Sequence, residues 1–159
     1  ASLFFIRQTS FTVLDMPHKV VVNSKIPVKL LKGDVFRGEF IASENYLGIV
    51  KIKFKEFVRA DFKGEDVLQF RIKEKNHKQW YHLNNYRSGI LENNLTLPFG
   101  FPVDENSREK IYVFEIESLL GTTTNAVTIE KIDYIYGGYQ ITKEQIFGSK
   151  KGLLIFLFK

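Results

Sequence analysis

Residues 97–139 read LPFGFPVDENSREKIYVFEIESLLGTTTNAVTIEKIDYIYGGY and contain two long segments in which polar and apolar residues alternate. These segments are residues 110–118 and 126–136, and a polar loop rich in threonine joins them. Alternation with a period of two is typical of antiparallel strands that face water on one side and the core on the other. The stretch therefore indicates an antiparallel sheet and argues against a helical or nucleotide-binding enzyme core.

The second of these segments changes its apolar parity after Ile129. An extra residue in a strand produces such a change, so we expect a β-bulge near Glu130 and Lys131. With that bulge, Tyr134 and Tyr136 face the interior. The Gly-Gly pair at 137–138 follows and predicts a two-residue hairpin turn.

Further strand candidates recur along the chain at the spacing of a sandwich. They are residues 3–8, 19–23, 28–31, 35–41, 47–57, 67–73 and 79–83, the two segments above, and residues 152–158. Alternation assigns nine side chains to the core, namely Val50, Ile52, Phe54, Leu68, Phe70, Ile72, Tyr112, Phe114 and Ile116. The one expected helix is residues 142–147, between the N-cap residue Thr142 and Gly148, and the prolines are expected in loops.

Long strands with almost no helix predict an all-β fold, an antiparallel β-sandwich that is jelly-roll-like with at most one short helix. The length of 159 residues suits a single domain over residues 1–159. A closed barrel is the alternative architecture. No run reaches the ~20 apolar residues of a membrane span, but both ends are apolar, which suits either buried strands or the approaches to flanking membrane segments.

The composition limits the chemistry that the chain can perform. It has no cysteine, which excludes disulfides, thiol catalysis and thiolate metal sites. The formal net charge of +5 permits an anionic partner, although solubility alone explains such a charge. No G-x-S-x-G, P-loop or G-x-G-x-x-G sequence is present, and the five-residue spacing of His77 and His82 suits no common metal motif. We therefore expect a non-catalytic protein.

Aromatic, amide and guanidinium side chains cluster between positions 80 and 87, outside the strongest alternation. A sugar ring can stack its C–H face on an aromatic ring while amide and guanidinium groups bond to its hydroxyls. The candidate ligand-binding residues are Trp80, Tyr81, His82, Asn84, Tyr86 and Arg87. The alternative interpretation places Trp80 in the core and the asparagines in turns.

Two other patterns concern ions. A basic face would form if two lysine-rich strands pair, unless Glu115 and Glu117 neutralise it; its residues would be Lys51, Lys53, Lys55, Arg71 and Lys73. This face lacks the interleaved aromatic residues of single-strand binders, so no nucleic acid partner is expected. Structural calcium is possible at two loops, which contain Asp61, Glu65 and Asp66, and Asp104, Glu105 and Asn106.

Four phrases of the sequence resemble a known kind of domain. They are FIASENYLGI at 40–49, FRIKE at 70–74, FEIES at 114–118 and NAVT at 125–128. Together they resemble the extracytoplasmic jelly-roll domains attached to bacterial polytopic membrane proteins of glycosyltransferase or cell-envelope type. More loosely, they are similar to carbohydrate-binding modules. The resemblance implies an envelope location and an appended, non-catalytic role, and it carries over no binding residue.

The function expected from the sequence is a non-catalytic glycan-recognition or assembly module of a bacterial cell-envelope protein. Its partner would be a glycan or another cell-envelope polymer. The alternative is a purely structural or protein–protein interaction domain of a larger membrane protein.

Overall fold

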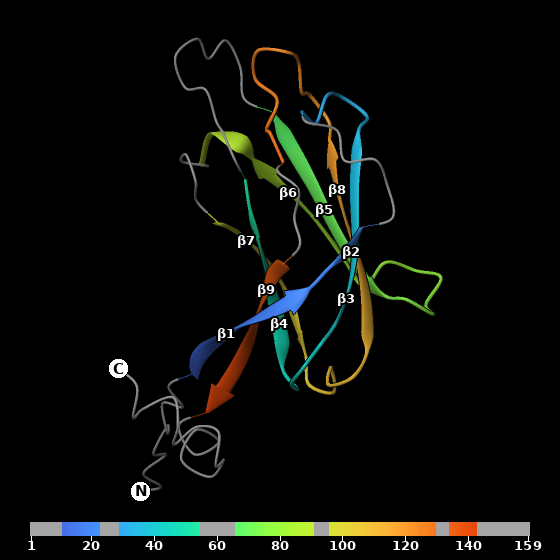
Figure 1. Ribbon diagram of the computed structural model, residues 1–159, viewed down its shortest axis with the longest axis vertical. Helices are drawn as coiled ribbons and strands as arrows, with labels where there is room; N and C mark the ends of the chain where they lie inside the picture. Colours follow the sequence, from blue (N-terminus) through green and yellow to red (C-terminus); the bar gives the residue numbers. More distant parts are fainter. Residues whose placement is uncertain (1–10, 23–28, 55–65, 91–95, 130–133, 143–159) are drawn as a thin grey trace, which may run out of the picture.

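Two antiparallel sheets packed face to face form the protein in the computed structural model (Figure 1). The structure describes residues 11–22, 29–54, 66–90, 96–129 and 134–142. The first sheet contains, in spatial order, β1 (Phe11–Lys19), β9 (Tyr134–Thr142), β4 (Leu47–Lys53) and β7 (Thr96–Asp104). The second contains β2 (Val21–Val22), β3 (Val35–Ile41), β8 (Ile111–Ser118), β5 (Val67–Glu74) and β6 (His82–Arg87).

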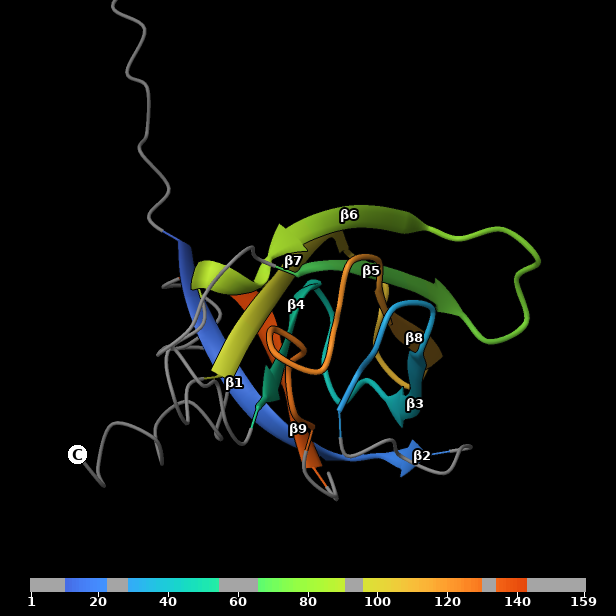
Figure 2. The same ribbon diagram turned by 90° about the horizontal axis from the view of Figure 1, so that it is seen from above.

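The strand pairing is nested, as in a long hairpin rolled over on itself. β1 pairs with β9, β3 with β8, β4 with β7 and β5 with β6, all antiparallel. The pairings β4–β9 and β5–β8 join these arms within each sheet. Figure 2 shows β1 running along one side of the molecule towards β2, which pairs with β3. Nested arms divided between two sheets give a jelly roll, so the predicted all-β sandwich is confirmed.

The core lies between the two sheets and is built largely of phenylalanine. Phe70 of β5 and Phe99 of β7 stack across the interface with ring centroids 4.6 Å apart, and Phe114 of β8 lies 6.4 Å from Phe70. All nine side chains that the alternation assigned to the core are buried. Val113 and Glu115 are buried as well, although they lie on the opposite side of their strand.

Helical structure is almost absent from the described residues. It is limited to a 3₁₀ turn, η1 (Ser88–Ile90), and no helix in this part of the chain has the length and apolar character needed to cross a membrane. The helix predicted at 142–147 lies outside the described residues except for Thr142, which ends β9. The terminal strands predicted at 3–8 and 152–158 also lie outside them.

Three prolines that were expected in loops lie in strands instead. Pro17 is in β1, and Pro98 and Pro102 are in β7; the alternation missed β7 and most of β1. Both strands are at the edges of the first sheet. Proline lacks the N–H that donates to a neighbouring strand, and on the open side of an edge strand no such bond is needed.

The hairpin predicted at the Gly-Gly pair is wrong, because β9 runs through both glycines. Their role is close packing. A Cβ atom on Gly137 would lie 2.8 Å from Nε2 of His18, and a Cβ atom on Gly138 would lie 2.9 Å from Cβ of Ile49. Real Cβ atoms do not approach other atoms so closely, so both positions require a residue without a side chain.

The predicted orientation of the tyrosines in β9 is also wrong. Tyr134 and Tyr136 are 61% and 46% exposed, whereas Ile135 and Tyr139 are buried. The predicted strand 126–136 begins too early, since residues 126–129 lie in a loop that contains an isolated bridge. The bulge predicted at 130–131 lies outside the described residues.

Candidate functional site

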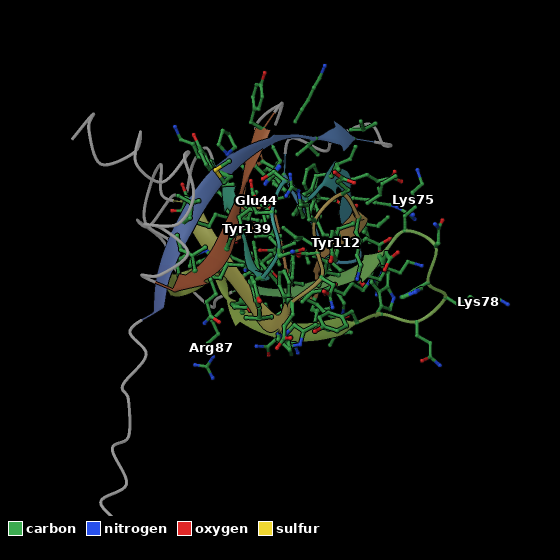
Figure 3. All side chains as sticks on the ribbon, turned by 90° about the horizontal axis from the view of Figure 1, so that it is seen from below. Glu44, Lys75, Lys78, Arg87, Tyr112 and Tyr139 are labelled. Carbon is green, nitrogen blue, oxygen red and sulfur yellow. The ribbon has the colours of Figure 1, made fainter. Side chains whose placement is uncertain are left out.

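The segment that was predicted to bind a ligand lies at the edge of the second sheet. Trp80 and Tyr81 end the turn after β5, and the other four predicted residues are in β6. His82, Asn84 and Tyr86 pair with core-facing residues of β5, so their side chains are on the side of β6 that faces the core. Arg87 is on the other side and extends away from the body of the protein (Figure 3). The six residues therefore do not share one surface.

Tyr81 and Tyr86 connect the two sheets. The hydroxyl of Tyr81 donates to the carbonyl of Pro102, and that of Tyr86 to the carbonyl of Gly100, each at 3.1 Å. The ring of Tyr86 also packs edge-on against Phe99, with centroids 5.0 Å apart. Both acceptors are in β7, so these tyrosines close the sandwich on the side where β6 and β7 meet.

Trp80 lies beside two cations of β5. Its ring centroid is 5.0 Å from Cζ of Arg71 and 5.1 Å from Nζ of Lys73, a cation–π arrangement. His82 is half-buried, and its Nε2 atom has no hydrogen-bond partner. Ligand binding by Trp80 stays a prediction, although its ring already interacts with these basic side chains.

The predicted basic face does not form. Lys51 and Lys53 are in the first sheet, whereas Arg71 and Lys73 are in the second, so they lie on different layers of the sandwich. Lys55 lies outside the described residues. Strands β4 and β5 follow each other along the chain but separate into different sheets, which sequence alternation alone does not reveal.

On the outer side of the second sheet, acidic residues neutralise the basic ones, as the alternative interpretation expected. Glu115 accepts from Arg71 at 2.5 Å and from Arg37 at 3.4 Å. Arg71 also lies 3.5 Å from Glu117. This part of the surface therefore presents little unbalanced charge to a ligand.

The first loop considered for calcium contains a carboxylate that holds backbone together. Asp66 is fully buried and accepts hydrogen bonds from Oγ of Ser118 at 2.8 Å and from the backbone N–H of Leu120 at 3.0 Å. Asp61 and Glu65 lie outside the described residues. The carboxylate of Asp66 thus orders the loop that follows β8.

The second loop considered for calcium is also internally bonded. The carboxylate of Asp104 accepts from Oη of Tyr112 at 2.6 Å and from Nζ of Lys110 at 3.0 Å. Its neighbours Glu105 and Asn106 are exposed. Across the described ranges, no group of three or more histidine, cysteine or acidic residues is placed to hold a metal ion.

The outward side of the first sheet carries two exposed tyrosines on a central strand. Tyr134 and Tyr136 are two residues apart on β9, between β1 and β4. Their side chains therefore share one side of the sheet and lie about 7 Å apart along the strand. We call this surface the tyrosine face; its charged and aromatic members among the described residues are Asp15, Lys19, Lys51, Lys53, Tyr134 and Tyr136.

An ion pair lies next to the tyrosines. The antiparallel register places Tyr136 between Pro17 of β1 and Lys51 of β4. Nζ of Lys51 lies 2.5 Å from Oδ2 of Asp15, which is on the neighbouring rung of the sheet. Both side chains are partly exposed. The tyrosine face therefore offers a carboxylate acceptor and an ammonium donor beside an aromatic ring.

A shallow hollow of about 260 Å³ continues the tyrosine face beyond Asp15. It is lined by Val13, Gly48, Ile49, Gly100, Phe101, Val103, Gly138 and Gln140. Gly100 leaves it open, because a Cβ atom at that position would meet no heavy atom within 4 Å. The lining is mostly apolar, and Gln140 adds an amide that can donate and accept hydrogen bonds.

The tyrosine face carries groups that can bind a sugar. Its two aromatic rings can stack on sugars, while Asp15, Lys51 and Gln140 can bond to hydroxyl groups. Asp15 is the one carboxylate that the described strands place on this face.

One residue in the sequence, Gln140, indicated that Tyr134 and Tyr136 face outward. Tyr134 and Tyr136 share parity with the apolar Ile132, which suggests an inward orientation. The same parity also includes Gln140, whose polar side chain is exposed in the structure. The positions of β9 that face inward include Gly137, and a glycine has no side chain to show whether its position is apolar or polar.

Comparisons with protein-family models, with curated proteins and with solved structures found no match to this chain. Its function is therefore inferred from the tyrosine face and the surrounding fold.

Proposed function

We propose that this protein is a non-catalytic glycan-recognition module and that the tyrosine face is its binding surface. The observation that carries the proposal is the exposure of Tyr134 and Tyr136 on a central strand, next to the ion pair of Asp15 and Lys51. Aromatic rings for stacking and charged groups for hydroxyls are the two elements that sugar recognition requires.

Both tyrosine rings are preorganised for ligand binding. A tyrosine side chain has few rotatable bonds, so ordering it on binding costs little conformational entropy. The neighbouring strands on both sides limit the movement of Tyr136 further. The spacing of Tyr134 and Tyr136 along β9 lets successive residues of one glycan chain cover the two rings, and the hollow near Gly100 provides space for a substituent.

The resemblance to extracytoplasmic jelly-roll domains supports the same proposal. Such domains are appended to membrane proteins of the bacterial cell envelope, where glycan polymers are abundant. We therefore propose an extracytoplasmic location, with glycan or cell-envelope polymer as the partner and with membrane segments elsewhere in a larger protein.

Glycan-array screening followed by titration calorimetry tests the proposal. We expect Tyr134→Ala and Tyr136→Ala each to weaken binding about fivefold, because each removes one stacking ring. Tyr134→Phe, which keeps the ring, should bind like the wild type. Circular dichroism checks that each variant is folded.

Two results would overturn the proposal. One is a wild-type protein that binds no glycan on the array. The other is a Trp80→Ala variant that loses binding while both tyrosine variants retain it, because the contact surface would then be the segment predicted from the sequence.

An interaction domain is the second candidate, and one observation favours it. Ile41 of β3 and Ile111 of β8 are cross-strand partners on the outer side of the second sheet, and they are 59% and 39% exposed. Paired exposed isoleucines suit a protein contact. If Ile41→Lys lowers association in sedimentation experiments while wild-type protein binds no glycan, the interaction role replaces glycan recognition.

A further inference from the structure

Two exposed lysines, Lys19 and Lys53, lie on the strands to either side of β9. The register of β1 with β9 places Lys19 opposite Tyr134. On the other side of β9, Lys51 is opposite Tyr136, and Lys53 follows two residues later on β4, on the same side of the sheet as Lys51. Lys19 and Lys53 are both exposed. Tyr134 therefore has one cation opposite it on β1, and a second, Lys53, lies on the same side of the sheet near the end of β4.

These two lysines are not neutralised within the described part of the chain. Lys51 is paired with Asp15, whereas no described carboxylate lies within salt-bridge distance of Lys19 or Lys53. Among the described residues, the tyrosine face thus has three lysines and one carboxylate, a formal balance of +2. The outer side of the second sheet differs, because there the arginines are paired with Glu115 and Glu117.

The distance between the two lysines suits one bound anionic group. Lys19 and Lys53 are on strands separated only by β9, and strands two places apart in a sheet are roughly 10 Å apart. Lysine side chains are long and flexible, and both ammonium groups can therefore approach a charge held above the ring of Tyr134. Their mutual repulsion is small, because this separation is about one Debye length at moderate salt.

We propose that the glycan bound by the tyrosine face is anionic, with a carboxylate or phosphate group placed over Tyr134 between Lys19 and Lys53. This inference rests on the proposed function and specifies the class of glycan. Asp15 lies two rungs away, where its carboxylate accepts hydrogen bonds from sugar hydroxyls. The face therefore has one end for charge and one end for hydroxyl groups.

The same arrangement argues against single-stranded nucleic acid as the ligand. Such binders follow a continuous phosphate backbone with a continuous basic groove. Here the ion pair of Asp15 and Lys51 interrupts the basic surface next to Tyr136. A glycan with one charged group and several hydroxyls per repeat does not need a continuous basic surface.

The test compares matched polymers by titration calorimetry with the full chain. The probes are one neutral glucan, the same glucan carrying carboxymethyl groups, the same glucan carrying phosphate groups, and single-stranded DNA. We expect the wild type to bind at least one charged glucan about tenfold more tightly than the neutral one, because two exposed ion contacts each contribute a few-fold. The carboxymethyl and phosphate arms identify which anionic group is preferred.

The variant Lys19→Gln/Lys53→Gln should lose this preference and keep its affinity for the neutral glucan. The control Lys32→Gln/Lys78→Gln removes the same charge from two exposed lysines that are not on the face, and it should bind like the wild type. Figure 3 shows Lys78 at the tip of its loop, extending away from the sheets. Raising the salt from about 0.1 M to about 1 M should remove the preference.

Several outcomes overturn the inference. Equal binding of neutral and charged glucans by the wild type shows that the glycan is not selected by charge, while the proposed function survives. An equal loss in both lysine variants shows a general effect of net charge. Tighter binding of DNA than of any glucan assigns the face to nucleic acid. If no glucan binds to the wild type or to any variant, the proposed function itself fails.

Discussion

His18 of β1 and Tyr139 of β9 share a buried hydrogen bond, with 2.8 Å between Nε2 of the histidine and Oη of the tyrosine. The same hydroxyl accepts from the backbone N–H of Ser43 at 3.0 Å. The ring of His18 lies 5.5 Å from that of Phe40, which belongs to the other sheet. His18 also bonds to the backbone of Ile41. This histidine therefore connects the edge of the first sheet to the second.

Stability should fall in mild acid because of His18. Burial lowers the pKa of His18 below its usual value of 6.5, and the hydrogen bond to Ile41 opposes this only in part. The unfolded chain then binds a proton more readily than the folded chain, so stability rises with pH. The contribution is complete above about pH 6.5 and is lost as the pH falls towards the lowered pKa of the folded state.

Urea unfolding at about pH 7.5 and about pH 5 measures this effect. The variant His18→Gln removes the titrating group and should lose less stability between the two conditions than the wild type. His77, which is exposed on a turn, provides the control His77→Gln. If His18→Gln and His77→Gln show the same pH dependence as the wild type, His18 does not control the acid response.

Asp66→Ala should be strongly destabilising. The buried carboxylate accepts from Ser118 and from the N–H of Leu120, and its removal leaves the buried hydroxyl of Ser118 and the partly buried N–H of Leu120 without this acceptor. We expect a loss of about 3 kcal/mol in the free energy of unfolding, measured by urea titration. The comparison is Asp34→Ala, since Asp34 accepts from the exposed N–H of Leu31. Equal losses in the two variants would contradict the role of burial.

The fold class was predictable because apolar residues alternate without interruption in β4, β5 and β8. The alternation shows directly that side chains such as those of Phe70 and Phe114 face the core. Strands β1 and β7 were missed because proline in an edge strand resembles a loop signal. The candidate site was missed for a related reason, since Gly137 interrupts the alternation that would have oriented Tyr134. Sheet membership depends on long-range pairing, which no local pattern records.

Tyr81 and Tyr86 should protect the edge of β7. Their hydroxyls donate hydrogen bonds to the carbonyls of Pro102 and Gly100, and Pro102 has no N–H that could donate to another strand. The variant Tyr81→Phe/Tyr86→Phe frees both carbonyls for pairing with another chain. We expect about 1 kcal/mol lower stability and more self-association on heating, measured by light scattering. Tyr134→Phe, which removes a hydroxyl elsewhere, should not associate; association by both variants would refute edge protection.

Gly100→Val should fill the hollow without damaging the fold. A Cβ atom at Gly100 meets no heavy atom within 4 Å, and β-branched residues are favoured in strands, so stability should stay the same or rise. A side chain there occupies space that we assign to a glycan substituent, so glycan affinity should fall, with Gly100→Ala intermediate. Calorimetry of binding and urea unfolding separate the two effects. If Gly100→Val binds glycans like the wild type, the hollow lies outside the binding surface, and contact is limited to the rungs of Tyr134 and Tyr136.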